Sequence, residues 1–111
     1  MKERVYKKKL INLDKDRIQK MVFKSVESVN ESLIAEEKIP HDSSVQIYGS
    51  NSHIDSFSFV QLIVGIEEIF FDIEGLEINL LDSVADVGDN FRSISDLVGL
   101  IQSLVNSQFN R

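Results

Sequence analysis

One apolar stretch, residues 54–70, constrains this chain more than any other feature. It reads Ile-Asp-Ser-Phe-Ser-Phe-Val-Gln-Leu-Ile-Val-Gly-Ile-Glu-Glu-Ile-Phe, and its large side chains recur at the three- and four-residue spacing of an α-helix. Asp55 stands where an N-cap belongs, because its carboxylate can accept a hydrogen bond from an unpaired N–H of the first turn. Ser56 is then the first helical residue and faces the preceding loop and the solvent. The sequence therefore predicts a serine hydroxyl beside a carboxylate at the start of a long apolar helix.

The segments on either side set the limits of this helix. Gly75 is a suitable C-terminal stop, because glycine readily adopts the left-handed conformation that ends many helices. Before the helix, residues 41–53 are rich in Gly, Ser and Asn and predict a loop. Its apolar residues, Val45, Ile47 and Tyr48, are expected to hold it against the core. A loop of this length is long for a compact domain and is commonly functional.

A second helix is predicted before the loop. Asp14 is a suitable N-cap, and Pro40 ends the segment because proline cannot donate to the helical hydrogen-bond ladder. We therefore expect helix from the residue after Asp14 to about Glu37. Its core-facing stripe consists of Ile18, Met21, Val22, Val26, Val29 and Leu33.

The C-terminal part predicts one short and one long helix. Apolar and polar side chains alternate in residues 76–81, and we interpret this segment as an extended loop lying on the core. Residues 83–89 predict a short helical turn that ends at Gly88. Ser93 and Asp96 form a capping box, in which each side chain accepts the backbone N–H of the other. An apolar stripe then continues at helical spacing to about Gln108.

These elements predict an all-α fold, a four-helix bundle with three long helices and one short helix. Each apolar stripe needs another stripe to bury it, and packed helices provide one. We assign residues 1–13 to a basic N-terminal extension and residues 14–108 to the helical domain. One alternative stays open for residues 45–60, whose alternating side chains are also compatible with a β-hairpin.

The charge of the chain is distributed unevenly. The formal net charge is −6, yet residues 1–20 hold eight Lys and Arg against three Asp and Glu. The remainder holds four against fifteen, so the body of the domain is acidic. An acidic body argues against nucleic-acid binding and favours partners with basic surfaces.

Composition also bears on the setting of the protein. The first nine residues are too polar to lead a secretory signal, and no run approaches the roughly 20 apolar residues that a membrane span needs. We therefore expect a cytoplasmic protein without a membrane span. The chain has no cysteine, so any thiol chemistry would have to be supplied from outside.

Catalysis by these residues alone is not the expected function. A serine hydrolase needs a nucleophile, a base and an orienting group, but successive residues such as Asp55 and Ser56 do not face one another on a helix. His53 is the other candidate base, and a hydrolase whose turnover depends on it stays a third possibility. The His and carboxylate residues lack a compact metal-ligand spacing, so no metal site is expected.

The surroundings of Ser56 form a longer pattern. A glycine- and serine-rich loop leads into Ile-Asp-Ser-Phe, and the apolar helix that follows ends in Glu67, Glu68 and a phenylalanine. Further along stands Asn-Phe-Arg-Ser-Ile-Ser-Asp-Leu, at residues 90–97. Over roughly residues 14–105 this order resembles the acyl carrier protein family, in which Asp-Ser-Leu opens the second helix of a small acidic four-helix bundle.

This resemblance implies a carrier without enzymatic activity of its own. Ser56 would hold a 4′-phosphopantetheine arm, attached by a phosphopantetheinyl transferase, and the thiol of the arm would carry an acyl or aminoacyl group as a thioester. A loading ligase and downstream transferases or synthases with basic docking patches would be its partners, and the protein would be a monomer. The docking residues implied are Asp55, Phe57, Val64, Glu67 and Glu68.

The chain departs from the family pattern in ways that affect partner choice. Phe57 replaces the usual leucine, and Ser58, Phe59 and Gln61 make the first turns less charged and more apolar than in the family, where these positions are often acidic. With the basic extension, these differences suggest a specialised pathway. The alternative is an unmodified helical interaction module, in which Phe57, Phe59, Ile69 and Phe71 form an apolar patch for a partner.

Overall fold

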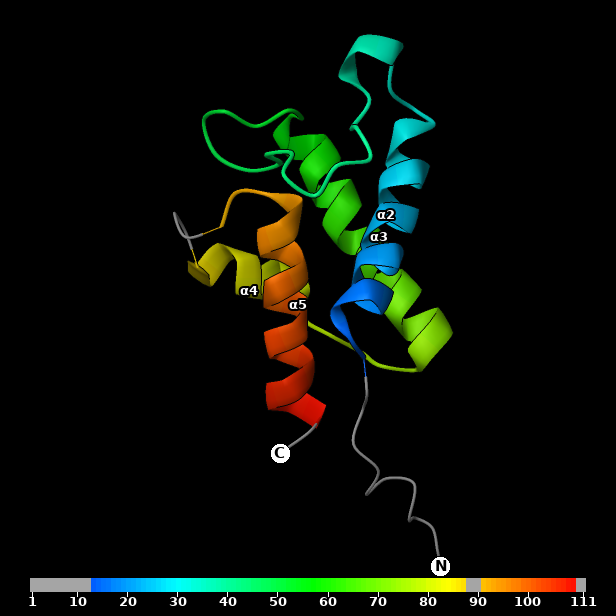
Figure 1. The fold of residues 1–111 in the computed structure, drawn as a ribbon, viewed down its shortest axis with the longest axis vertical. Coiled ribbons are helices and arrows are strands. Elements are labelled where there is room, and N and C mark those ends of the chain that lie inside the picture. The colour runs from blue at the N-terminus through cyan, green and yellow to red at the C-terminus, as the bar shows by residue number, and fades with distance from the viewer. Residues whose placement is uncertain (1–12, 88–90, 110–111) are drawn as a thin grey trace, which may run out of the picture.

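The computed structural model of this protein describes residues 13–87 and 91–109. Over these residues the chain forms four α-helices and one short 3-10 helix, and it contains no β-strand. Figure 1 shows the helices side by side, with the long connection between α2 and α3 at one end. The elements are α2 (Lys15–Asn30), η1 (Ala35–Glu37), α3 (Ser56–Glu74), α4 (Leu80–Val87) and α5 (Ile94–Phe109).

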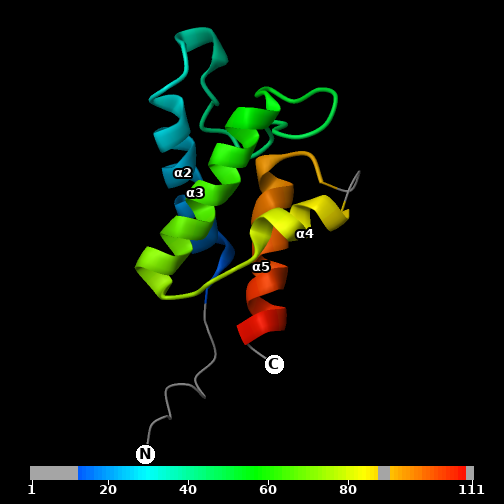
Figure 2. The same cartoon turned by 180° about the vertical axis from the view of Figure 1, so that it is seen from behind.

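Three of these helices are long and one is short. α2 and α5 have 16 residues each, α3 has 19 and α4 has eight. α2 packs against both α3 and α5, and α4 lies against α3 (Figures 1 and 2). The predicted all-α bundle of three long helices and one short helix is confirmed. None of the helices in the described ranges is long and apolar enough to cross a membrane.

One apolar core joins the helices. The stripe predicted for α2 is buried apart from Leu33, which is half-buried beyond the end of the helix. Leu13, which we assigned to the N-terminal extension, is also buried against this core. Residues 1–12, the rest of that extension, lie outside the described residues.

α2 ends earlier than predicted. It stops at Asn30, and Glu37 belongs instead to the separate turn η1. The Asn30 side chain accepts a hydrogen bond from Ile39 N at 2.8 Å and donates one to Ile39 O at 3.0 Å. These two hydrogen bonds hold the following segment against the C-terminal end of α2, so the helix ends well before Pro40.

Both predicted ends of α3 are confirmed. At its start, Asp55 Oδ1 accepts a hydrogen bond from Ser58 N at 2.8 Å. At its end, Gly75 adopts φ +69°, a left-handed conformation that disfavours residues with a Cβ.

α4 starts earlier than predicted, and α5 starts as predicted. Leu76 and Ile78 are buried in an extended segment, but Leu80 is already the first residue of α4. Gly88, the expected end of this helix, lies outside the described residues. The capping box of α5 forms: Ser93 Oγ accepts from Asp96 N and Asp96 Oδ2 accepts from Ser93 N, both at 3.1 Å.

The loop before α3 is anchored on the start of α5. Ile47 N donates to Arg92 O at 2.7 Å, and Ile94 N donates to Val45 O at 3.1 Å. The β-hairpin alternative is therefore wrong, because residues from Ser56 onward are helical and the loop pairs with a different segment. Ile47 is buried and Val45 half-buried, so the apolar anchor predicted for this loop is confirmed.

Candidate functional site at the start of α3

Ser56 is the first residue of α3, and its side chain is exposed, as predicted. The chain reaches it through a turn closed by Ser52, whose Oγ donates to Ile54 O at 2.7 Å and lies 3.1 Å from Ile54 N, which donates to it. Because this turn and the helix cap are both hydrogen-bonded, the serine is presented at a defined place on the surface.

The Asp55 carboxylate caps the N-terminus of α3. Its Oδ1 accepts from Ser58 N at 2.8 Å, and hydrogen bonds from the backbone N–H and the hydroxyl of Ser58 hold the pKa of the Asp55 carboxyl below its usual value. The group is therefore ionised at neutral pH and a weak proton acceptor. It places a negative charge beside Ser56 and is poorly suited to remove the serine proton.

His53 is also engaged away from Ser56. Its Nε2 lies 2.7 Å from Lys38 O, so this nitrogen donates a hydrogen bond to the carbonyl. With Asp55 bonded to Ser58, the three residues do not form the serine–histidine–carboxylate chain of a hydrolase. The described residues also contain no group of three or more His, Cys, Asp or Glu placed to hold a metal ion.

Gly49 allows the loop to pass close to a cation. Its φ is +95°, and a Cβ at this position would lie 3.0 Å from Arg92 Nη1. A larger residue would be strained by its backbone and would push against the guanidinium. Arg92 therefore places a positive charge against the loop that borders Ser56.

A hollow of about 140 Å³ lies beside Ser56, between the loop and the first turns of α3. Tyr48 and Phe59 line it, and their rings pack with that of Phe91 at centroid distances of 5.0 to 6.1 Å. A cavity of about 150 Å³ is known to hold benzene. The hollow therefore has room for a small group, and the core residues Ile47 and Phe59 form part of its wall.

The apolar docking residues predicted from the sequence share an exposed side of α3. Phe57 is 70% exposed and Val64 is 37% exposed. Two further residues at helical spacing on this side, Val60 and Phe71, are 41% and 59% exposed. We call these four residues, together with the exposed Glu68, the outer face of α3.

Sequence reasoning did not assign Val60 to the docking residues, although its spacing from Phe57 carried the signal. α3 has apolar residues on both of its sides, so periodicity alone does not tell which side is buried. Only part of the apolar patch predicted for the interaction module is on the surface. Phe57 and Phe71 are exposed, but Ile69 is half-buried and Phe59 is buried in the core.

Glu67 and Glu68 have different environments. Glu67 is half-buried, and its Oε2 accepts hydrogen bonds from Leu80 N at 2.8 Å and Leu81 N at 3.1 Å. It therefore caps the start of α4 from a neighbouring helix, a role that sequence reasoning missed. Glu68 is exposed and available to a partner.

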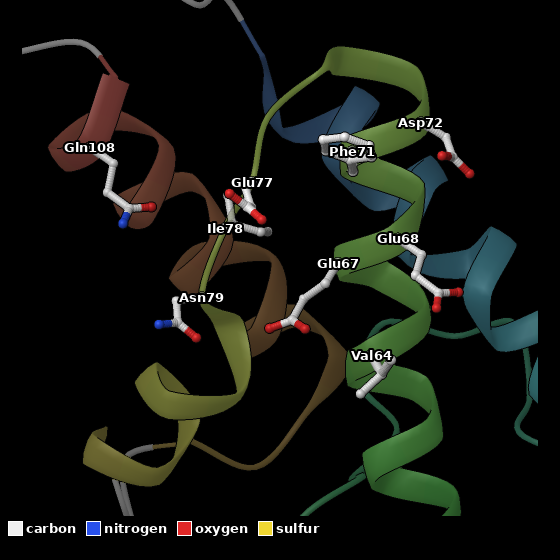
Figure 3. Close-up of a pocket in the computed structure, with 9 residues that line it drawn as sticks. All are labelled: Val64, Glu67, Glu68, Phe71, Asp72, Glu77, Ile78, Asn79 and Gln108. Atoms are coloured by element: carbon white, nitrogen blue, oxygen red, sulfur yellow. The ribbon is translucent and has the colours of Figure 1, made fainter.

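A groove of about 920 Å³ runs beside the C-terminal half of α3 (Figure 3). We call it the acidic groove, because four carboxylates line it. In Figure 3, Glu67, Phe71 and Glu77 point into the space between α3 and the segment that leads to α4, while Glu68 and Asp72 lie along the outer edge of α3. The lining residues are Val64, Glu67, Glu68, Phe71, Asp72, Glu77, Ile78, Asn79 and Gln108.

Comparisons with known proteins do not add to this picture: no family model, no curated protein and no solved structure matches the chain.

Proposed function

We propose that this protein is a carrier of the acyl carrier type, with a 4′-phosphopantetheine arm on Ser56. The observation that supports this most is the exposed serine at the first position of α3, a helix of 19 residues. The bundle of three long helices and one short helix and the acidic body of the chain support it as well.

The site suits a phosphate ester. A helix N-terminus offers unpaired N–H groups and a partial positive charge, and both stabilise a phosphate attached there. Arg92, which packs against Gly49 in the adjoining loop, adds a full positive charge to the surroundings. The Asp55 carboxylate repels the phosphate, so the attraction from the helix N-terminus and Arg92 has to exceed this repulsion.

Attachment would be a transfer from coenzyme A. Ser56 Oγ would attack the phosphorus next to the pantetheine unit, forming a phosphodiester as adenosine 3′,5′-bisphosphate leaves, and the serine proton would pass to a base of the transferase. Asp55 would face the transferase and the metal ion that the transferase holds. The attached arm supplies a thiol, which this cysteine-free chain lacks, for holding acyl or aminoacyl groups as thioesters.

The outer face of α3 would meet the transferase, the loading ligase and the downstream transferase or synthase. Phe57 and Val64 offer apolar contact area, and Glu68 offers a charge for basic patches on these enzymes. Exposed charges of this kind mainly accelerate association, which suits a shuttle that must also be released. The pathway, whether in fatty acid or secondary-metabolite biosynthesis, would follow from the ligase that loads the arm.

The hollow beside Ser56 bears on the cargo. With about 140 Å³ of space, it can receive a group about the size of benzene. A longer cargo would extend beyond this hollow.

The test is a mass measurement. The purified protein is incubated with coenzyme A and a broad-specificity phosphopantetheinyl transferase, and we expect it to gain the mass of one phosphopantetheine group. Ser56→Ala should gain nothing, while Ser50→Ala, which removes another exposed hydroxyl from the same loop, should be modified like the wild type. An unchanged mass of the wild type, or the same adduct on Ser56→Ala, would contradict the proposal.

The exposed aromatic side chains of α3 support a second candidate function, the unmodified interaction module. Contiguous exposed apolar surface commonly marks an interface, and Phe57 and Phe71 are 70% and 59% exposed. This candidate predicts that Ser56→Ala leaves partner binding intact while Phe57→Ser abolishes it. Because Phe59 is buried, its substitution would unfold the protein and cannot serve in this test.

A further inference from the structure

The acidic groove combines negative charge with exposed apolar surface. Its edges carry Glu68 and Asp72 on α3 and Glu77 on the segment before α4, all exposed. Between them lies Phe71, which is 59% exposed, and Val64, which is 37% exposed, lines the groove further along α3 (Figure 3). Among the residues that the structure describes, no Lys, Arg or His lines the groove. This surface matches a peptide segment that is basic and partly apolar.

The chain itself contains such a segment. Residues 1–12 hold five Lys and Arg against a single Glu, and apolar residues stand on both sides of the run Lys7-Lys8-Lys9. We infer that this N-terminal segment docks in the acidic groove of its own chain. Its lysines pair with the carboxylates at the edges, and its apolar residues cover Phe71 and Val64.

The position of residue 13 makes this contact possible. Leu13 is buried where the described chain begins, and Arg17 forms an ion pair with Glu74, which ties the start of α2 to the end of α3. Figure 1 shows that α2 begins at the same end of the molecule at which α3 ends. The N-terminal segment is therefore attached at the end of α3 that borders the groove.

The length of the segment is also sufficient. From Glu74 to Val64, at the far end of the groove, α3 rises about 15 Å, at 1.5 Å per residue. Twelve extended residues reach about 40 Å. The tether also keeps the segment at an effective concentration of about 1 mM, which allows weak ion pairs to hold it in place.

Other occupants fit the surface less well. A second copy docked through this groove would bring Glu68, Asp72 and Glu77 of the two chains together, and like charges repel. The docked segment would cover part of the outer face of α3, including Glu68, so basic partners would have to displace it. The inference does not depend on modification of Ser56 and is testable on the unmodified protein.

The experiment uses paramagnetic relaxation in the full-length protein. Because the chain has no cysteine, Glu3→Cys creates a unique site for a nitroxide label and leaves all five basic residues of the segment in place. At low ionic strength we expect the label to broaden the amide resonances of residues 64–72 and 77–79 at least twofold more than those of α2. The pattern should be independent of protein concentration and should fade in 0.5 M salt, where the Debye length is only about 4 Å.

Three charge-reversal variants make the test specific. Glu68→Lys with Asp72→Lys should abolish the selective broadening, and adding Lys7→Glu with Lys8→Glu should restore it. Glu36→Lys with Glu37→Lys is the matched control: it makes the same change in charge on η1, outside the groove, and should leave the pattern unchanged. Uniform broadening, broadening centred on another surface, or broadening that requires a second, unlabelled chain would each overturn the inference.

Discussion

At the residue scale, Glu67 and Glu68 show how neighbouring side chains acquire different roles. Successive helical residues point about 100° apart. As a result, Glu67 reaches the first N–H groups of α4, at 2.8 and 3.1 Å, while Glu68 faces the solvent. One carboxylate is therefore part of the fold, and the other belongs to the surface available for binding.

We expect Glu67→Ala to lower the free energy of unfolding by about 1–2 kcal/mol, the cost of removing a helix cap. Glu68→Ala removes the same charge from an exposed position and should change stability by less than about 0.5 kcal/mol. Urea unfolding followed by far-UV circular dichroism measures both. Equal stabilities of the two variants would show that the α4 cap contributes nothing.

At the scale of the elements, the contact between α2 and α3 depends on Gly65. A Cβ at this residue would clash with Ser25 Oγ, which is buried and donates to Leu62 O at 3.0 Å. The missing side chain lets the two helices approach and lets the hydroxyl of one helix reach a carbonyl of the other. Glycine is therefore required in the middle of α3, although it is a poor helix former.

Gly65→Ala should destabilise the protein by about 1–2 kcal/mol, because a clash of this kind costs about 1–3 kcal/mol and the gain in helix propensity offsets at most about 1 kcal/mol. The double variant Ser25→Ala, Gly65→Ala should be more stable than Gly65→Ala alone, because Ser25 Cβ would lie at an ordinary contact distance of 3.6 Å. Thermal and urea unfolding of both single variants and the double variant complete the cycle. A wild-type stability for Gly65→Ala would mean that α2 and α3 are not packed closely here.

At the scale of the whole molecule, carboxylates that accept backbone N–H groups make stability depend on pH. Hydrogen bonds from Ser93 N and Arg92 N hold the pKa of the Asp96 carboxyl below its usual value, and Ser44 N does the same for Asp42. Asp55 at the start of α3 behaves likewise. Each folded pKa lies below the unfolded one, so the stability that these groups contribute is present above the unfolded pKa and is lost as the pH falls through the folded pKa.

The free energy of unfolding should therefore fall steeply below about pH 4, the ordinary pKa of a carboxyl group. Repulsion among positive charges lowers the stability further at this pH, because the chain carries 12 Lys and Arg and two His and has a pI near 4.8. Asp96→Asn should reduce the loss between neutral and acid pH, while Asp86→Asn, an exposed control on α4, should follow the wild type. Urea unfolding midpoints measured across this pH range test it, and a stability that rises on acidification would contradict it.

The sequence by itself determined the elements whose boundaries depend on nearby residues. The caps formed by Asp14 with Arg17 N, Asp55 with Ser58 N, and Ser93 with Asp96 all join residues three apart, so they can be recognised in a short window. The number and type of helices followed from these caps and from the apolar stripes. The exposed position of Ser56 followed in the same way, because it is the residue after a cap.

Only the tertiary structure decided the features that join distant residues. Asn30 ends α2 by bonding Ile39, nine residues away, and Glu67 starts α4 at Leu80, 13 residues away. The side of α3 left exposed was decided in the same way, because both sides are apolar and the packing of α2 and α4 selects which is covered. Local periodicity cannot report such contacts, since their partners are brought together only when the chain has folded.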